Sequence, residues 1–136
     1  MSLTDNLKEK TLYFFYGVLG FSTSVWSKVY GLEKGNSFLV SYAHDVSGPF
    51  AFYFANRLLF EFAGFPFGKN KLTTAATVFT YCSAIEIEQG LGLTKGTYDP
   101  YDFLTYAVGV GLAVGVDHLT SGKRKKKSES IDEIVE

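Results

Sequence analysis

Four stretches of the chain contain no charged residue and are rich in large apolar side chains. They cover residues 11–27, 46–56, 72–85 and 103–116. None reaches the roughly 18 to 20 residues of an unmistakable membrane-spanning helix. They can be extended, however, by aromatic residues typical of a membrane interface, such as Tyr30. The pattern therefore predicts four membrane helices of about 18 to 22 residues each.

Basic residues are distributed unevenly between these stretches. If both termini and the loop at 65–71 share one side of the membrane, that side carries nine basic residues and the other side three. The first group is Lys8, Lys10, Lys69, Lys71 and residues 123–127, and the second is Lys28, Lys34 and Lys95. Because basic residues favour the cytoplasmic side, we expect an all-α polytopic membrane protein of the inner or cytoplasmic membrane. It would be a four-helix transmembrane bundle with both termini cytoplasmic.

Charge divides the 136-residue chain into three segments. We expect residues 1–10 to form a cytoplasmic N-terminal segment, 11–119 the four-helix membrane domain, and 120–136 a disordered, charged cytoplasmic tail. The basic block at 123–127 is expected to lie on anionic lipid headgroups and not on nucleic acid. Since 17% of the residues are aromatic, a soluble helical protein with an aromatic core is the alternative.

Small residues in two of the predicted helices indicate where helices approach closely. Gly111 and Gly115 form a GxxxG pair, extended by Ala107, in the fourth helix. Gly17 and Gly20 occupy the first helix. Lipid gives no hydrophobic drive for helix association, so we expect these residues at helix contacts.

Polar residues gather at the predicted extracytoplasmic ends of the helices. The candidate ligand-binding residues are His44, Asp45, Glu86, Gln89, Asp99 and Asp102. Glu86 and Gln89 are three residues apart and share a helix face, whereas Glu88 points elsewhere. A carboxylate near the end of a membrane helix is costly unless it is paired or hydrated. We therefore expect Glu86 to have a specific role.

Three of these acids also have a purely structural interpretation. Asp99 has the features of a helix N-cap, and Asp102 those of a first-turn acid favoured by the helix dipole. Asp45 or Ser47 is interpreted as the cap of a second helix that begins at Pro49. The sequence leaves open whether these acids bind a ligand or only cap helices.

Arg57 and Glu61 form a separate candidate pair inside the membrane domain. Their four-residue spacing places them on one face of the second helix, where each can neutralise the other. We also expect Asn56 to hydrogen-bond to a neighbouring helix. Both a structural and a functional role remain open for the pair.

The third and fourth predicted helices carry a pattern that resembles the VanZ-like proteins, small multi-helix membrane proteins. Five residues match positions of the family's motif: Glu86, Gln89, Asp99, Asp102 and Gly109. Thr105 stands where the family's pattern has Asn. The match covers residues 80–115, and the segment beginning at His44 fits more loosely. The family is named for a member associated with glycopeptide antibiotic resistance, so the resemblance implies a role in the cell envelope.

Two functions from different classes follow. The first is binding of an envelope component by the acidic cluster, which would favour a cation, a basic partner or hydrogen-bond donors over bare phosphate. The alternative is a structural accessory subunit of a larger membrane protein complex. The expected partners are membrane lipids, together with such a complex or a homo-oligomer, and not nucleic acid.

Catalysis is not expected. His44 next to Asp45 is a conceivable general base, but adjacent helix residues point about 100° apart and do not form an oriented dyad. Familiar nucleophile, zinc-protease and phosphate-loop motifs do not occur. The single Cys82 excludes an internal disulfide and a cysteine-based metal site. We assign no catalytic residue, cofactor or metal.

Transport would require oligomerisation, because four short helices enclose little interior.

Overall fold

The computed structural model describes residues 3–66 and 70–135, with side chains placed for residues 6–66 and 70–121. In this part of the chain every regular element is helical. The elements are α1 (Leu3–Lys34), a short π-helix η1 (Leu39–Ala43), α2 (His44–Phe62), α3 (Lys71–Gly90) and α4 (Asp102–Val135). The all-α fold with four long helices is confirmed.

The helix ends follow from local sequence chemistry. Gly35, Gly64 and Gly92 each have a positive φ and follow the ends of α1, α2 and α3. Glycine reaches this left-handed conformation without steric cost, so it ends a helix readily. At the start of α3, the Asn70 side chain accepts a hydrogen bond from the Leu72 backbone N–H at 2.9 Å.

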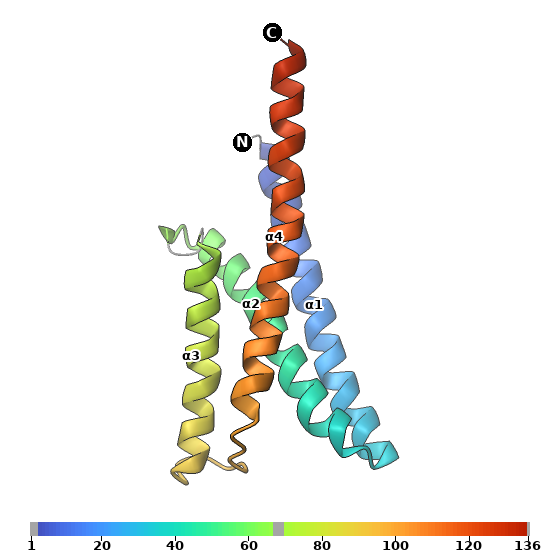
Figure 1. The fold of residues 1–136 in the computed structure, drawn as a ribbon, viewed down its shortest axis with the longest axis vertical. Helices are drawn as coiled ribbons and strands as arrows, with labels where there is room; N and C mark the ends of the chain where they lie inside the picture. The colour runs from blue at the N-terminus through green and yellow to red at the C-terminus, as the bar shows by residue number, and fades with distance from the viewer. Residues whose placement is uncertain (1–2, 67–69, 136) are drawn as a thin grey trace.

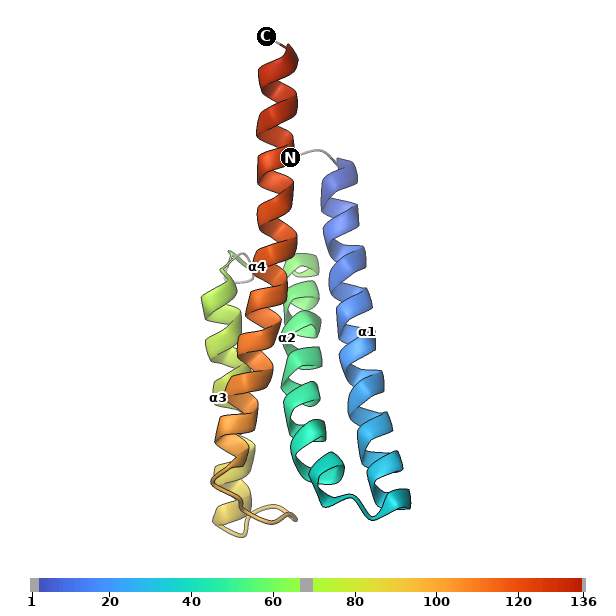
Figure 2. The same cartoon turned by 45° about the vertical axis from the view of Figure 1, so that its right-hand side comes forward.

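The helices form a bundle in which α2 contacts each of the other three. Both chain termini and the α2–α3 connection point toward one end, which we call the proximal end (Figure 1). The α1–α2 and α3–α4 connections lie at the opposite, distal end. A second view shows that α4 extends past the other helices at the proximal end (Figure 2). This alternation of the connections agrees with the predicted up-and-down topology.

The predicted disordered tail differs from the structure, because α4 continues to Val135 through this segment. Helix α1 includes residues 3–10 of the predicted N-terminal segment. Residues 123–135 are rich in Lys and Glu and contain no Gly or Pro, so their helix propensity allows continuation. The side chains of residues 122–136, and all of residues 67–69, lie outside the described residues. The basic block at 123–127, which we predicted to contact lipid headgroups, therefore has no described side chains.

The start of α2 was also predicted incorrectly. The helix begins at His44, not at Pro49, and its N-cap position shows no side-chain hydrogen bond. The preceding η1 is itself helical, so its backbone leads into α2 without a capping side chain. Asp45 lies in the first turn of α2, and the Ser47 hydroxyl donates to the Ala43 carbonyl at 2.7 Å. Neither residue has the capping role that we expected.

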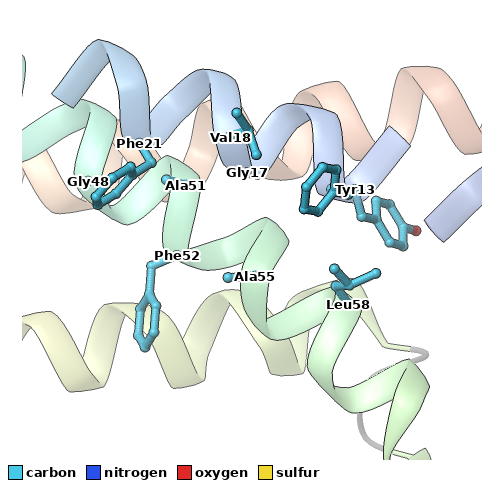
Figure 3. A pocket seen from close by; sticks show the side chains of 10 residues that line it. Tyr13, Gly17, Val18, Phe21, Gly48, Ala51, Phe52, Ala55 and Leu58 are labelled. Atoms are coloured by element: carbon cyan, nitrogen blue, oxygen red, sulfur yellow. The ribbon is translucent and has the colours of Figure 1, made fainter. Parts of the chain in front are cut away.

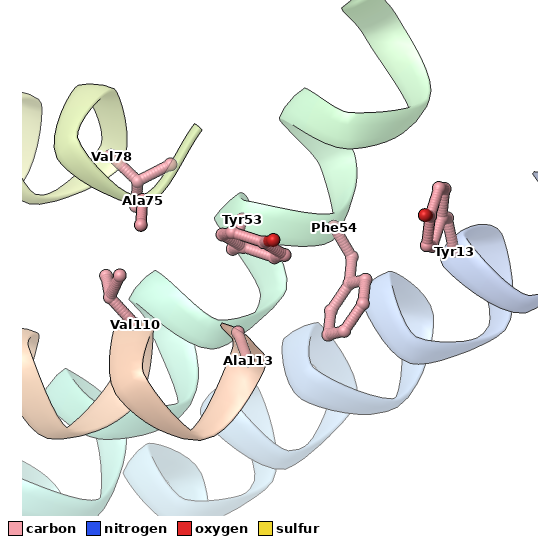
Figure 4. Packing of buried hydrophobic residues seen from close by; sticks show 7 residues of the cluster. All are labelled: Tyr13, Tyr53, Phe54, Ala75, Val78, Val110 and Ala113. Carbon is pink, nitrogen blue, oxygen red and sulfur yellow. The ribbon is translucent and has the colours of Figure 1, made fainter. Parts of the chain in front are cut away.

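Few apolar residues are buried, and they link all four helices (Figure 4). The cluster consists of Tyr13, Tyr53, Phe54, Ala75, Val78, Val110 and Ala113. Glycine allows the closest helix approaches beside it. A Cβ atom at Gly109 would overlap the Val46 carbonyl of α2. Gly111 and Gly115, in contrast, are exposed with no atom near the Cβ position, so the expected GxxxG contact is not formed between described residues.

The distribution of polarity is the reverse of that in most soluble proteins. Far more large apolar side chains are exposed than buried, among them Phe14, Phe21 and Trp26. The buried polar residues are Ser24, Ser27, Asn56, Arg57, Thr74, Glu86, Thr105 and Asp117. In the described part of the chain, one helical segment, Asp102–Ser121, is long and apolar enough by itself to cross a membrane. The four-span topology therefore remains a prediction.

Gly109 and Gly111 provide a matched test of this packing. We expect Gly109→Ala to lower the free energy of unfolding by about 1–3 kcal/mol, because the methyl group must displace the α2 backbone. Gly111→Ala should be neutral, or stabilising by up to about 1 kcal/mol, because it adds helix propensity without a contact. Denaturant unfolding in mixed micelles measures both. Equal effects of the two substitutions would contradict the assigned α2–α4 contact.

Candidate functional site

Four acids meet at the distal end of the bundle. Asp45 lies in the first turn of α2, Glu86 in the last turns of α3, and Asp99 and Asp102 at the start of α4. We call these four residues the distal acidic cluster. Three separate segments of the chain thus bring together the carboxylates that the sequence analysis selected.

Glu86 holds the distal end together. Its side chain is buried, with 1% of the residue exposed. One carboxylate oxygen accepts the Asp99 backbone N–H at 2.7 Å, and the other accepts the Tyr106 hydroxyl at 3.2 Å. Glu88, in contrast, is exposed, as the helix geometry predicts. Because both Glu86 oxygens have partners, this residue joins α3 to the start of α4.

Asp99 and Gln89 shape the connection between α3 and α4. The Asp99 carboxylate accepts the Tyr101 backbone N–H at 2.9 Å. Because α4 begins at Asp102, this bond orders the turn that leads into the helix, and Asp99 does not occupy the predicted N-cap position. The Gln89 side chain packs over Gly96 so closely that a Cβ atom there would overlap its amide. Both side chains therefore have a structural role in this connection.

Asp45 and Asp102 are the open carboxylates of the cluster. Both are half-buried, and neither carboxylate forms a hydrogen bond or ion pair with another described residue. Burial, together with the negative charges of Glu86 and Asp99 and against the opposing effect of Lys28, raises the pKa of Asp45 to about 6. Asp102 in turn lies within electrostatic range of Asp45. Two neighbouring carboxylates without partners favour a bound cation or hydrogen-bond donors.

His44 lies beside the cluster but is bonded to α1. Its Nδ1 atom is 2.7 Å from the Ser24 hydroxyl oxygen and 3.2 Å from the Ser24 carbonyl oxygen. The histidine therefore joins α1 to the start of α2 and does not pair with Asp45. No three His, Cys, Asp or Glu side chains in the described residues are placed to hold a metal ion.

A second polar group, which we call the proximal ion cluster, occupies the bundle interior near the other end. Its centre is Asp117, whose side chain is fully buried. One Asp117 oxygen lies 3.2 Å from Arg57 Nε and accepts the Tyr53 hydroxyl at 2.7 Å. The other accepts the Ser121 hydroxyl at 3.0 Å and lies 3.8 Å from Lys71 Nζ. Each oxygen thus has more than one partner.

The α1 helix completes the proximal ion cluster through Tyr13 and Glu9. Arg57 donates to the Tyr13 hydroxyl oxygen at 2.7 Å, and this hydroxyl donates to Glu9. The expected Arg57–Glu61 pair is not observed: among the described residues, Arg57 forms its ion pairs with Asp117 and Glu9. Asp117 provides a better partner because it is fully buried and itself requires a cation.

Two further features of this region were missed by the sequence analysis. Asn56 donates to the Phe52 carbonyl of its own helix at 2.9 Å, not to a neighbouring helix. Asp117 was not selected because it directly follows the last uncharged stretch. Its spacing from Val110 and Ala113, both buried, places it on the inward face of α4. This periodicity is the signal that identifies it.

No protein-family model matches the chain, and neither curated proteins nor solved structures show a significant match to it. The resemblance to VanZ-like proteins therefore stays a prediction. Thr105, where that family has Asn, is buried, and its hydroxyl donates to the Asp102 carbonyl of α4.

The proximal ion cluster is testable with a double-mutant cycle on Arg57 and Asp117. Each single alanine substitution should lower the free energy of unfolding by about 3–5 kcal/mol, because it leaves an unpaired buried charge. The double variant should be less destabilised than the sum of the two single variants, with a coupling energy between Arg57 and Asp117 of about 1–3 kcal/mol. Glu61→Gln is the control and should cost less than about 1 kcal/mol. Coupling of Arg57 to Glu61 in place of Asp117 would contradict the observed pairing.

The raised pKa of Asp45 predicts pH-dependent stability. A carboxyl whose pKa rises from 3.8 to about 6 on folding stabilises the fold at low pH, and this contribution is lost as pH rises through 6. Wild-type protein should therefore have a lower Tm at about pH 8 than at about pH 5, and Asp45→Asn should reduce this difference.

The matched control is Glu88→Gln, which removes an exposed acid at the same end of the bundle and should leave the pH dependence unchanged. Thermal unfolding in detergent across this pH range measures all three proteins. An Asp45→Asn variant with the wild-type pH profile would refute a raised Asp45 pKa.

Proposed function

We propose that the protein is a polytopic membrane protein that binds an envelope component through Asp45 and Asp102 at its distal end. Insertion is supported by the large apolar side chains on the outside of the bundle and the polar residues inside it. Phe14, Phe21 and Trp26 are each more than half exposed, which is unfavourable in water and favourable in lipid. The interior ion pair and hydroxyl contacts are the kind of interaction that joins helices within a bilayer.

The proposed orientation places the distal end outside the cytoplasm. The proximal end carries Lys8, Lys10 and Lys71. The basic residues at 123–127 lie in the part of α4 that extends past this end. Positive charge favours the cytoplasmic side, so both termini would lie there. The four helices would then span the membrane with the distal acidic cluster at its outer surface.

The observation that carries the binding proposal is the contrast between the two polar groups. In the proximal ion cluster, basic residues and hydroxyl groups surround Asp117. In the distal acidic cluster, Glu86 and Asp99 have partners, whereas Asp45 and Asp102 have none among the described residues. A ligand that presents ammonium or hydroxyl groups would provide the missing donors.

The experiment compares ligand retention by the wild type and an Asp45→Asn, Asp102→Asn double variant. Each protein is purified from membranes in mild detergent and analysed by native mass spectrometry with lipid analysis. We expect an amine-bearing or hydroxyl-rich envelope lipid to accompany the wild type, and its retention to fall more than about tenfold in the variant. Each lost charge-assisted hydrogen bond weakens binding by about 1.5–3 kcal/mol.

Glu88→Gln is the charge-matched control, and circular dichroism establishes that each variant is folded. Equal retention by the folded double variant would refute the binding site. A protein subunit that accompanies every variant at fixed stoichiometry would instead favour the accessory-subunit function. Release of the protein from membranes by alkaline washing would refute insertion itself.

A further inference from the structure

An apolar groove runs between α1 and α2 and borders the proximal ion cluster at Tyr13. It has a volume of about 390 Å³. Tyr13, Gly17 and Val18 line it from α1, and Ala51, Ala55 and Leu58 line it from α2 (Figure 3). The only polar side chain among its lining residues is Tyr13, and that hydroxyl is bonded within the proximal ion cluster. The groove therefore suits a ligand without hydrogen-bonding groups, such as a hydrocarbon chain.

Two aromatic residues bound the groove. Phe21 lies near Gly48 toward the distal end (Figure 3). Phe52 lines it and points toward α3, where its ring contacts that of Tyr81 at a centroid distance of 5.2 Å. From these rings the groove continues toward Tyr13 and Leu58 at the proximal end.

A positive charge lies where the groove reaches the proximal end. The Lys10 amine lies over the Phe62 ring, 4.8 Å from its centroid, and so spans from α1 to α2. Lys10 and Phe62 are each about one helical turn beyond the lining residues Tyr13 and Leu58. The carboxylate of Glu61 lies within electrostatic range of Lys10. An amine beside a carboxylate complements the phosphate and the ammonium group of a zwitterionic phospholipid.

We propose that this groove binds one acyl chain of a phospholipid from the proximal leaflet, with the lipid phosphate at Lys10. The proposal rests on the membrane insertion proposed above but not on the distal binding site. An acyl chain matches the apolar lining, and the charge at the groove mouth matches the headgroup. In the proposed orientation Lys10 lies at the membrane interface, where a lysine attracts the phosphates of lipid headgroups.

The test uses the full chain reconstituted in vesicles of phosphatidylethanolamine and phosphatidylglycerol that contain a phosphatidylethanolamine with a photoactivatable acyl chain. After illumination, mass spectrometry locates the labelled residues. Labelling should concentrate on the facing sides of α1 and α2. Ala55→Leu fills the groove and should reduce labelling there about fivefold, equivalent to about 1 kcal/mol of lost packing. Lys10→Gln should reduce it as well.

Ala76→Leu is the matched control, because it makes the same change at an exposed position of α3 and should leave groove labelling unchanged. Uniform labelling of all exposed helix faces would show only surrounding bilayer lipid and would overturn the proposal. Cross-links from the groove to a second copy of the chain would overturn it in favour of a dimer contact. Vesicle flotation separates the cases: protein that does not float refutes insertion, whereas floating protein with uniform labelling refutes the groove site alone.

Discussion

The ion pair between Arg57 and Asp117 is the interaction on which the arrangement of the bundle depends. Burying two opposite charges costs several kcal/mol per ion unless hydrogen bonds satisfy the remaining polar atoms. Asp117 meets this requirement with groups from α1, α2 and α3 as well as from its own helix. Because the buried charges need all of these partners at once, they fix how the four helices pack near the proximal end.

The same requirement distinguishes the two ends of the molecule. At the proximal end, Arg57 and Lys71 accompany the buried acid, and tyrosine hydroxyls complete its surroundings. At the distal end, Glu86 is satisfied by a backbone N–H and a hydroxyl, and the remaining acids face one another with Lys28 as the nearby base. A cluster of like charges opposes folding, which agrees with the proposal that an external partner supplies the missing donors.

The sequence was informative where structure depends on neighbours along the chain and uninformative where it depends on other helices. The four long helices follow from local spacing, and the structure confirms them. The structure also places Asp45, Glu86 and Asp102 near helix ends, as the sequence pattern predicts. The partner of Arg57 did not follow, because an i, i+4 rule compares residues of one helix only. For the same reason the glycine motif in α4 was misleading: of its glycines with described surroundings, Gly109 faces another helix closely, whereas Gly111 and Gly115 do not.

The groove between α1 and α2 has its origin in how these helices meet. A Cβ atom at Gly20 would lie 3.0 Å from the Ala51 side chain, whereas at Gly17 the nearest atom would be 3.8 Å away. The approach of the two helices is therefore closer at Gly20 than at Gly17. Small residues permit the contact but cannot fill the space beside it. An empty space of this kind forfeits packing contacts, and the proposed lipid chain would supply them if the bundle packs in lipid as proposed.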